Sequence, residues 1–101
     1  MFIEHAELTV PAERAEAFQA AFEEGRKVIA QAPGFQWAEL WQGVERPGTH
    51  LLLVGWETVE AHTVGFRGSE LFTRWRAAVG PYFSAPPAVE HYASVGPRHV
   101  G

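Results

Sequence analysis

Cysteine is absent from the 101-residue sequence, which excludes a disulfide framework, a thiolate nucleophile and a thiolate metal site. Long apolar stretches are also missing, since none reaches the roughly 18 residues that a membrane-spanning helix needs. The N-terminus, Met1-Phe2-Ile3-Glu4-His5, lacks the basic start and the apolar run of a signal peptide. We therefore expect a soluble cytoplasmic protein without a membrane partner.

Positive charge is scarce. The net charge is −4, and Arg26-Lys27 is the only run of two basic residues. Arg74 and Arg76 flank Trp75 but do not extend into a patch. Because a surface that follows phosphates needs clustered Lys and Arg, we do not expect a nucleic-acid partner.

Metal and phosphate motifs are missing as well. The histidines are scattered, with no close pair and no His-x-x-x-His spacing, so no metal site is predicted. They are His5, His50, His62, His91 and His99. There is no Gly-rich phosphate loop and no Gly-x-Ser-x-Gly elbow, so nucleotide and hydrolase chemistry find no support.

Aromatic residues are abundant instead. The chain has four Trp and seven Phe, and 47% of its residues are hydrophobic. Its length suits one core, so we predict a single domain over residues 1–101, with 96–101 as a loose tail. The rings either fill that core or line a pocket for a flat ligand.

Hydrophobic periodicity predicts an alternating order of strands and helices. The expected strands are 2–10, 35–44, 49–57 and 88–95; the expected helices are 12–31 and a split second region, 59–66 and 69–79. This β-α-β-β-α-β order is typical of an α+β, ferredoxin-like fold, with a four-stranded antiparallel sheet and helices on one face.

Both faces of the predicted sheet carry apolar side chains. In the second strand, alternation groups Phe35, Trp37, Glu39 and Trp41 on one face, with Ala38 and Leu40 on the other. The third strand is apolar on both faces. Helices can cover only one of them, so we expect a homodimer through the other face of the sheet.

Several motifs resemble the antibiotic biosynthesis monooxygenase family over nearly the whole chain. They are Gly55-Trp56-Glu57-Thr58-Val59-Glu60-Ala61-His62, Phe66-Arg67-Gly68-Ser69, Trp75, Pro33-Gly34-Phe35 and Ala85-Pro86-Pro87. The resemblance implies a dimeric α+β barrel in which two sheets face each other. It also implies a pocket in each subunit, between the sheet and its own helices. The substrate-binding side chains would be Trp37, Trp41, Leu52, Phe18, Phe22, Phe66, Phe72 and Trp75.

The resemblance implies several possible functions. The first is a cofactor-independent monooxygenase acting on a small quinol- or anthrone-like phenol, with no metal or other cofactor. The alternative is a non-catalytic, dimeric ligand-binding protein or one whose pocket is filled by its own rings. A third is an isomerase or signal-degrading enzyme. Haem-cleaving relatives use an asparagine, a tryptophan and a histidine ligand, but Ala6, Phe66 and Arg76 stand at the matching positions, so haem cleavage is not predicted.

Three residues are candidates for catalysis: His62, Trp56 and Glu39. His62 stands where the polyketide oxygenases place a tyrosine, and is either a base or a histidine of the surface or of the first turn of a helix. Trp56, a tryptophan in those enzymes too, either stacks on the substrate and donates its indole N–H, or packs under the helices. An asparagine of that group corresponds to Leu52, which departs from the pattern.

Glu39 lies between two tryptophans of the second strand. Burial among those rings would make it a candidate general base. The alternatives are a local reversal of the strand register or an ion pair with an arginine such as Arg26. His50, close to the predicted hairpin, is expected to be exposed.

Overall fold

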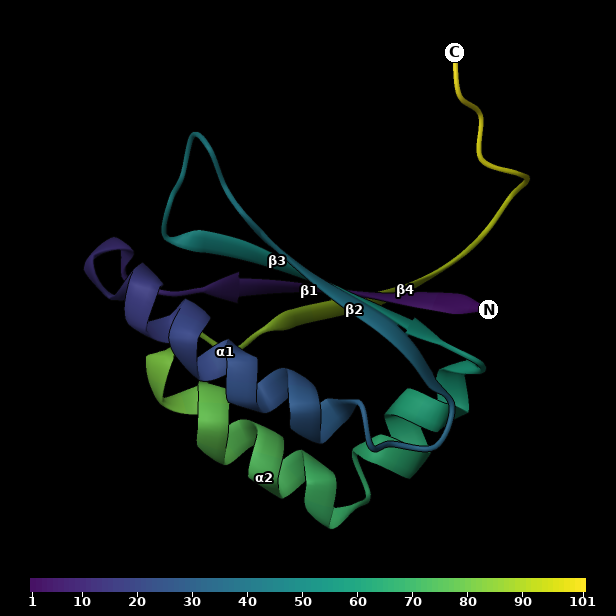
Figure 1. The fold of residues 1–101 in the computed structure, drawn as a ribbon, viewed down its shortest axis with the longest axis horizontal. Coiled ribbons are helices and arrows are strands. Elements are labelled where there is room, and N and C mark those ends of the chain that lie inside the picture. Colours follow the sequence, from purple (N-terminus) through teal and green to yellow (C-terminus); the bar gives the residue numbers. More distant parts are fainter.

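A computed structural model describes residues 1–101 and contains one four-stranded sheet. The strands are β1 (Phe2–Thr9), β2 (Phe35–Gln42), β3 (Thr49–Trp56) and β4 (Ala88–Ala93). Their order is β2-β3-β1-β4, and every neighbouring pair is antiparallel. The helices α1 (Ala15–Ile29) and α2 (Glu70–Val79) lie together on one face of this sheet (Figure 1). The predicted ferredoxin-like α+β fold is therefore confirmed.

The helical segments differ from the prediction in detail. The first begins as a short 3-10 turn, η1 (Ala12–Arg14), before α1. The second region is split as expected, and its first part is a π-helix, η2 (Ala61–Phe66). The Thr58 hydroxyl accepts a hydrogen bond from the Ala61 backbone N–H over 3.0 Å, which satisfies one free donor where this helix starts. A second 3-10 turn, η3 (Gly80–Tyr82), follows α2.

The core lies between the sheet and the two long helices. Strict alternation in β1 and β3 turns every second side chain toward the helices, as predicted. Side chains from both layers are almost completely buried: Ala6, Leu8, Leu52, Val54, Trp56, Phe18, Ile29 and Val79. Burying an aliphatic or aromatic side chain of this size contributes roughly 1.5–3 kcal/mol, so these positions hold the layers together.

The face predicted for most of β2 is wrong, because the strand contains a bulge. Its register shifts between Phe35 and Trp37, so that Phe35 lies opposite Trp56 and Trp37 lies opposite Gly55. One extra residue reverses the alternation beyond it. The ring of Trp37 rests against Gly55 on the face away from the helices, where a Cβ on Gly55 would collide with the indole.

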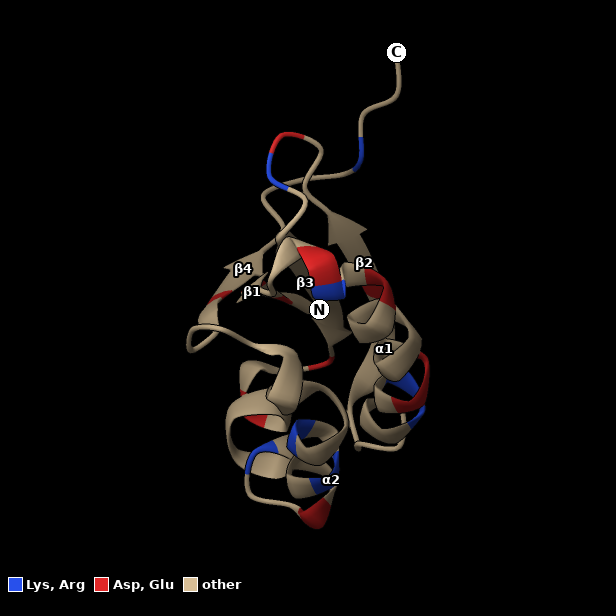
Figure 2. Cartoon of the chain, turned by 90° about the vertical axis from the view of Figure 1, so that its left-hand side faces the viewer, with Lys and Arg blue, Asp and Glu red and all other residues tan.

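The same bulge moves the other two polar and aromatic side chains of β2 outward. Ala38 and Leu40 pack against the core, whereas Glu39 and Trp41 are exposed. Together with Leu51 and the neighbouring residues of β3, Glu39 and Trp41 form the open face of the sheet. Figure 2 shows that charged residues gather mainly on the helices and connecting loops, with much of the sheet carrying neither charge.

The C-terminal end leaves the body of the molecule (Figure 1). β4 ends at Ala93, two residues earlier than predicted, and 96–101 have no regular secondary structure. None of the helices combines the length and the apolar character of a membrane-spanning segment.

Candidate functional site

A cavity of about 1030 Å³ lies between the inner face of the sheet and α2. The sheet contributes Glu4, Ala6, Leu8, Leu52 and Val89 to its wall. Helix α2 contributes Phe72, Trp75 and Arg76, and the loop from Gly80 to Pro87 closes one side. This volume is at the upper end of ordinary ligand pockets and can hold a planar molecule of two or three rings.

Glu4 is the only acidic side chain in the cavity wall. It lies in the middle of the apolar inner face of β1 and is only 5% exposed. Its Oε1 accepts a hydrogen bond from Trp56 Nε1 over 3.0 Å, while Oε2 has no hydrogen-bond partner in the protein. Burial raises the pKa of the Glu4 carboxyl, and the Trp56 hydrogen bond and the charge of Arg67 offset part of that rise.

His62 lies directly behind this carboxyl. The π-helix η2 stacks its imidazole on the indole of Trp56, with ring centroids 5.2 Å apart and planes inclined by 15°. Its Nε2 lies 3.3 Å from Glu4 Oε1, and its Nδ1 lies 2.8 Å from His91 Nε2. The side chain is buried, so the alternative of a surface histidine is wrong.

The same surroundings keep His62 uncharged. Burial, followed by the positive charge of Arg67 and by repulsion from His91 when that ring is protonated, lowers the pKa of His62 to about 4. At neutral pH its contact with Glu4 therefore joins a neutral ring to a carboxyl. Since Glu4 and His91 approach different nitrogens of His62, the three side chains form a line and do not converge on one point. As arranged, they could not all bind one metal ion, and no group of three potential metal ligands occurs in the chain.

Arginine supplies the positive charge near the cavity. Arg67 follows η2, and its backbone N–H donates to the His62 carbonyl over 3.0 Å, the i+5 bond that characterises a π-helix. The guanidinium of Arg76 lies 5.7 Å from the centre of the Phe72 ring. Both arginines are exposed, line the cavity and take part in no ion pair.

The predicted site residues fall into four groups. Leu52, Phe72 and Trp75 line the cavity. Trp56 and His62 lie behind it and reach it only through Glu4; the Trp56 indole is fully buried and its N–H is occupied. The core holds Phe18 and Phe66, and Phe22 borders a second, smaller cavity of about 440 Å³.

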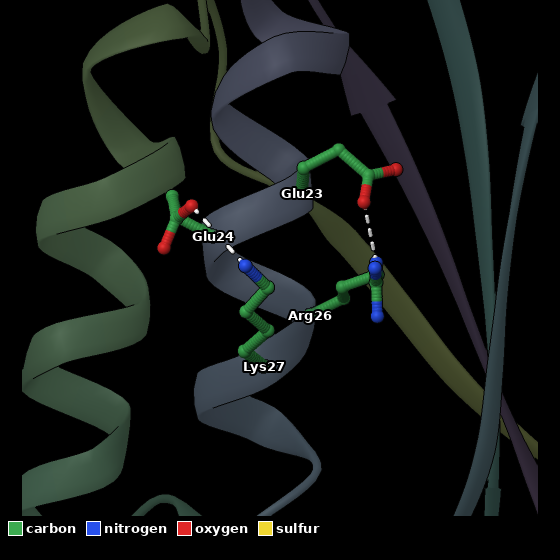
Figure 3. Close-up of polar contacts among 4 residues, drawn as sticks. All are labelled: Glu23, Glu24, Arg26 and Lys27. Carbon is green, nitrogen blue, oxygen red and sulfur yellow. Dashed lines mark hydrogen bonds and ion pairs between the residues drawn. The ribbon is translucent and has the colours of Figure 1, made fainter.

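The remaining predicted residues, Trp37, Glu39 and Trp41, lie on the opposite face of the sheet. The exposed Glu39 accepts a long, 3.4 Å hydrogen bond from Trp41 Nε1. It does not pair with Arg26, which binds Glu23 one turn earlier on α1 at 2.6 Å (Figure 3). The local reversal of strand register is the correct alternative for Glu39.

The expectation that His50 is exposed is wrong. This histidine occupies an inward-facing position of β3 and is completely covered, with its ring edge-on to Phe18 at 4.9 Å. Its Nε2 lies 3.1 Å from Gln19 Nε2, and its Nδ1 has no partner. Burial lowers the pKa of His50, so it is a neutral core histidine.

Two site residues are not among the predicted candidates, Glu4 and His91. A signal exists for Glu4, which is a lone carboxylate on an otherwise apolar strand face. His91 becomes visible only with the pairing of β1 and β4, which sets it opposite Glu4, whereas His5 lies opposite Glu90. Strand register of this kind cannot be read from local sequence.

Comparison with known proteins gives a consistent result. The model of the family described as antibiotic biosynthesis monooxygenase matches residues 1–78. The uncharacterised protein YczJ of Bacillus subtilis (strain 168) is 37% identical over 78 residues, covering 77% of this chain and 82% of its own length.

Solved structures share the fold. One from Bordetella bronchiseptica that carries the same family name has a TM-score of 0.90 at 36% identity, and the match covers 93% of this chain and 96% of that one. SnoaB from Streptomyces nogalater, a cofactor-independent oxygenase, has a TM-score of 0.78 at 14% identity, with 95% and 94% covered. At that identity the likeness to SnoaB concerns the fold alone.

Proposed function

The chain belongs to the antibiotic biosynthesis monooxygenase family, and we propose that it oxidises a small phenolic substrate, quinol- or anthrone-like, with O₂ and without a bound cofactor. One observation carries this proposal. A buried carboxyl, that of Glu4, lines a cavity of about 1030 Å³ and has one of its oxygens held by Trp56. A raised carboxyl pKa makes Glu4 a stronger proton acceptor than an exposed glutamate.

The cavity wall suits a flat, acidic molecule. Phe72 and Trp75 offer aromatic surface opposite the apolar inner face of the sheet. Arg67 and Arg76 supply positive charge that favours the substrate anion once its proton is removed. Leu52 adds apolar surface. Trp56 and His62 act through Glu4, by holding Oε1 and orienting the carboxyl.

The chemistry balances without a further reductant. Glu4 Oε2 takes a proton from the activated CH₂ of an anthrone-type substrate, and the resulting carbanion passes one electron to O₂. The two radicals combine to a peroxide, which takes the proton back. Loss of water, with removal of the second C–H proton, leaves a ketone. One oxygen atom enters the product and the other leaves as water, and all four electrons come from the two C–H bonds.

The test is oxygen consumption by metal-stripped protein with a hydroxyanthrone, comparing wild type with Glu4→Gln and Glu39→Gln. We expect uptake without added cofactor, and a loss of at least about 100-fold in Glu4→Gln because its base is gone. Glu39→Gln, an equally conservative change on the opposite face, should keep its activity. Equal loss in both variants would contradict the assignment of Glu4 as the base.

An open cavity favours this function over a protein whose pocket is filled by its own rings. Phe18 and Phe66 occupy the core, yet the space beside Glu4 remains empty of side chains. A hydroxyanthrone that binds, shown by tryptophan fluorescence, but consumes no O₂ would move the conclusion to a ligand-binding protein.

The open face of the sheet supports association of two copies. Leu51 and Leu53 lie there only half-buried, and Trp41 is 58% exposed beside them. An apolar, aromatic sheet face of this kind is costly to leave in water. The protein therefore forms a homodimer through this face, sheet against sheet, as the family resemblance implies.

A further inference from the structure

We infer that His62 and His91 form a proton relay that connects the Glu4 carboxyl with solvent at the edge of the sheet. The inference rests on the proposed function for the role of Glu4, but the relay itself is defined by geometry. Three side chains from three different elements, β1, η2 and β4, meet in a line. The distances along it are 3.3 Å from Glu4 Oε1 to His62 Nε2 and 2.8 Å from His62 Nδ1 to His91 Nε2.

Both ends of this line are open. Glu4 Oε2 and His91 Nδ1 have no hydrogen-bond partner in the protein, yet the only fully covered side-chain nitrogen or oxygen without a partner is His50 Nδ1. Neither Glu4 Oε2 nor His91 Nδ1 is therefore sealed from its surroundings. Glu4 lines the cavity, and His91 is only half-buried on the edge strand β4. The line therefore begins in the cavity and ends at the surface.

Two arrangements of protons fit the same heavy atoms. When Glu4 is ionised, His62 presents its Nε2–H to Glu4 Oε1, and His91 donates its Nε2–H to His62 Nδ1. When Oε1 carries a proton, Glu4 donates to His62 Nε2, and His62 donates its Nδ1–H to His91. Passing from the second arrangement to the first moves one proton out of Glu4 and releases one from His91 Nδ1. No atom is oxidised or reduced, and no ring has to hold a charge.

The electrostatic surroundings favour neutral rings. Burial lowers the pKa of both His62 and His91, and the positive charge of Arg67 lowers each of them further. The same arginine is the charged group that acts on Glu4. Because an imidazolium is disfavoured at both ring positions, the proton passes between neutral tautomers.

Such a relay solves a problem that the cavity creates. Substrate bound against Glu4 covers Oε2, so the carboxyl can no longer exchange its proton through the cavity. Exchange through His62 and His91 lets Glu4 lose a proton behind the bound substrate and begin the reaction ionised.

The first experiment needs no substrate, so it is independent of the proposed function. Ring ¹⁵N NMR reports which nitrogen of each histidine carries the proton. As pH falls from 7, we expect His62 to change from the Nε2–H to the Nδ1–H form while still neutral, together with His91. Glu4→Gln should abolish this step, and His5→Gln, on the outer face of the sheet, should leave it intact. Independent changes in the two rings, or no change of His62 before it becomes charged, would overturn the relay.

The second experiment uses turnover. His91→Ala should lower kcat by about 10-fold or more with KM unchanged, and added imidazole should restore part of the loss. His5→Ala is the matched control. It should keep the kcat of wild type, and added imidazole should not change that kcat. A His91→Ala protein with normal kcat would overturn the relay, and so would one whose loss imidazole cannot restore. If wild type consumes no O₂ at all, the proposed function fails and the NMR result alone decides the relay.

Discussion

Glu4 shows how one carboxyl can remain inside an apolar layer. Removing it from water is costly, because the charged form loses its hydration. Trp56 Nε1 restores one hydrogen bond, and Arg67 supplies an opposite charge nearby. Neither fully compensates, which leaves the carboxyl as a proton acceptor with a raised pKa. The site therefore depends on incomplete stabilisation of a single residue.

His62 should make stability depend on pH. Its pKa is about 4 in the folded chain and about 6.5 when unfolded, so the folded state resists protonation. The stability present above pH 6.5 is lost as pH falls toward 4, by up to roughly 3 kcal/mol. We expect chemical denaturation at pH 7 and pH 4 to show a larger loss for wild type than for His62→Gln. The raised pKa of Glu4 changes stability with pH in the opposite direction. Because Glu4 is present in both wild type and His62→Gln, the comparison still reports on His62.

His99→Gln is the control for this prediction, since His99 lies exposed in the C-terminal tail. Its loss of stability between the two pH values should equal that of wild type. If His62→Gln behaves in the same way as His99→Gln, the buried ring does not carry the cost of protonation assigned to it.

At the scale of elements, regular alternation was predictable and its interruption was not. The inner faces of β1 and β3 follow from their sequences, because apolar residues recur there at every second position. In β2 the same rule fails after Phe35, where a bulge adds one residue, and no residue type at Gln36 announces it. The pairing of Glu4 with His91 depends on how distant strands align, so local patterns could not reveal it.

The turn before β2 provides a test of how η2 is positioned. Gly34 has a φ of +86°, and a Cβ there would lie 2.7 Å from the Cβ of Ala61, the first residue of η2. Gly34→Ala should therefore lower the free energy of unfolding by about 1–3 kcal/mol, through both backbone strain and this collision. Because Ala61 precedes His62, the variant should also have lower activity. Urea denaturation measures the first effect and O₂ uptake the second.

Gly80→Ala is the matched substitution. Gly80 has a helical φ of −57°, and a Cβ there would meet nothing within 4 Å. Its effect should stay within about 1 kcal/mol in either direction. A Gly34→Ala protein as stable as Gly80→Ala would mean that the turn adapts and does not fix the start of η2.

The whole molecule has two layers, a sheet and its helices, and the outer face of the sheet is uncovered. Its extents of 40 × 38 × 20 Å describe a flat body, and only 19 of 101 residues are buried. Helices cover one face of the sheet and enclose the cavity, while the opposite face presents Leu51, Leu53 and Trp41. The cavity lies between the sheet and α2, on the side opposite this open face. Dimerisation through the open face would therefore complete the burial of the sheet without covering the cavity.

Leu53→Lys separates these two roles. Leu53 lies in the centre of the open face with Glu39 opposite it on β2, so a lysine there gains a cross-strand partner and the single chain stays folded. In a sheet-to-sheet dimer, two-fold symmetry would bury this charge twice, weakening association by at least about 100-fold.

Sedimentation equilibrium should give twice the 11.2 kDa chain mass for wild type and the single mass for the Leu53→Lys variant. Val64→Lys, at an apolar position on η2 that is 68% exposed, should remain dimeric. Because the cavity lies on the helix side of the sheet, away from Leu53, monomeric Leu53→Lys should still bind a hydroxyanthrone. A monomeric wild type would remove the dimer from the proposal but leave the cavity in place.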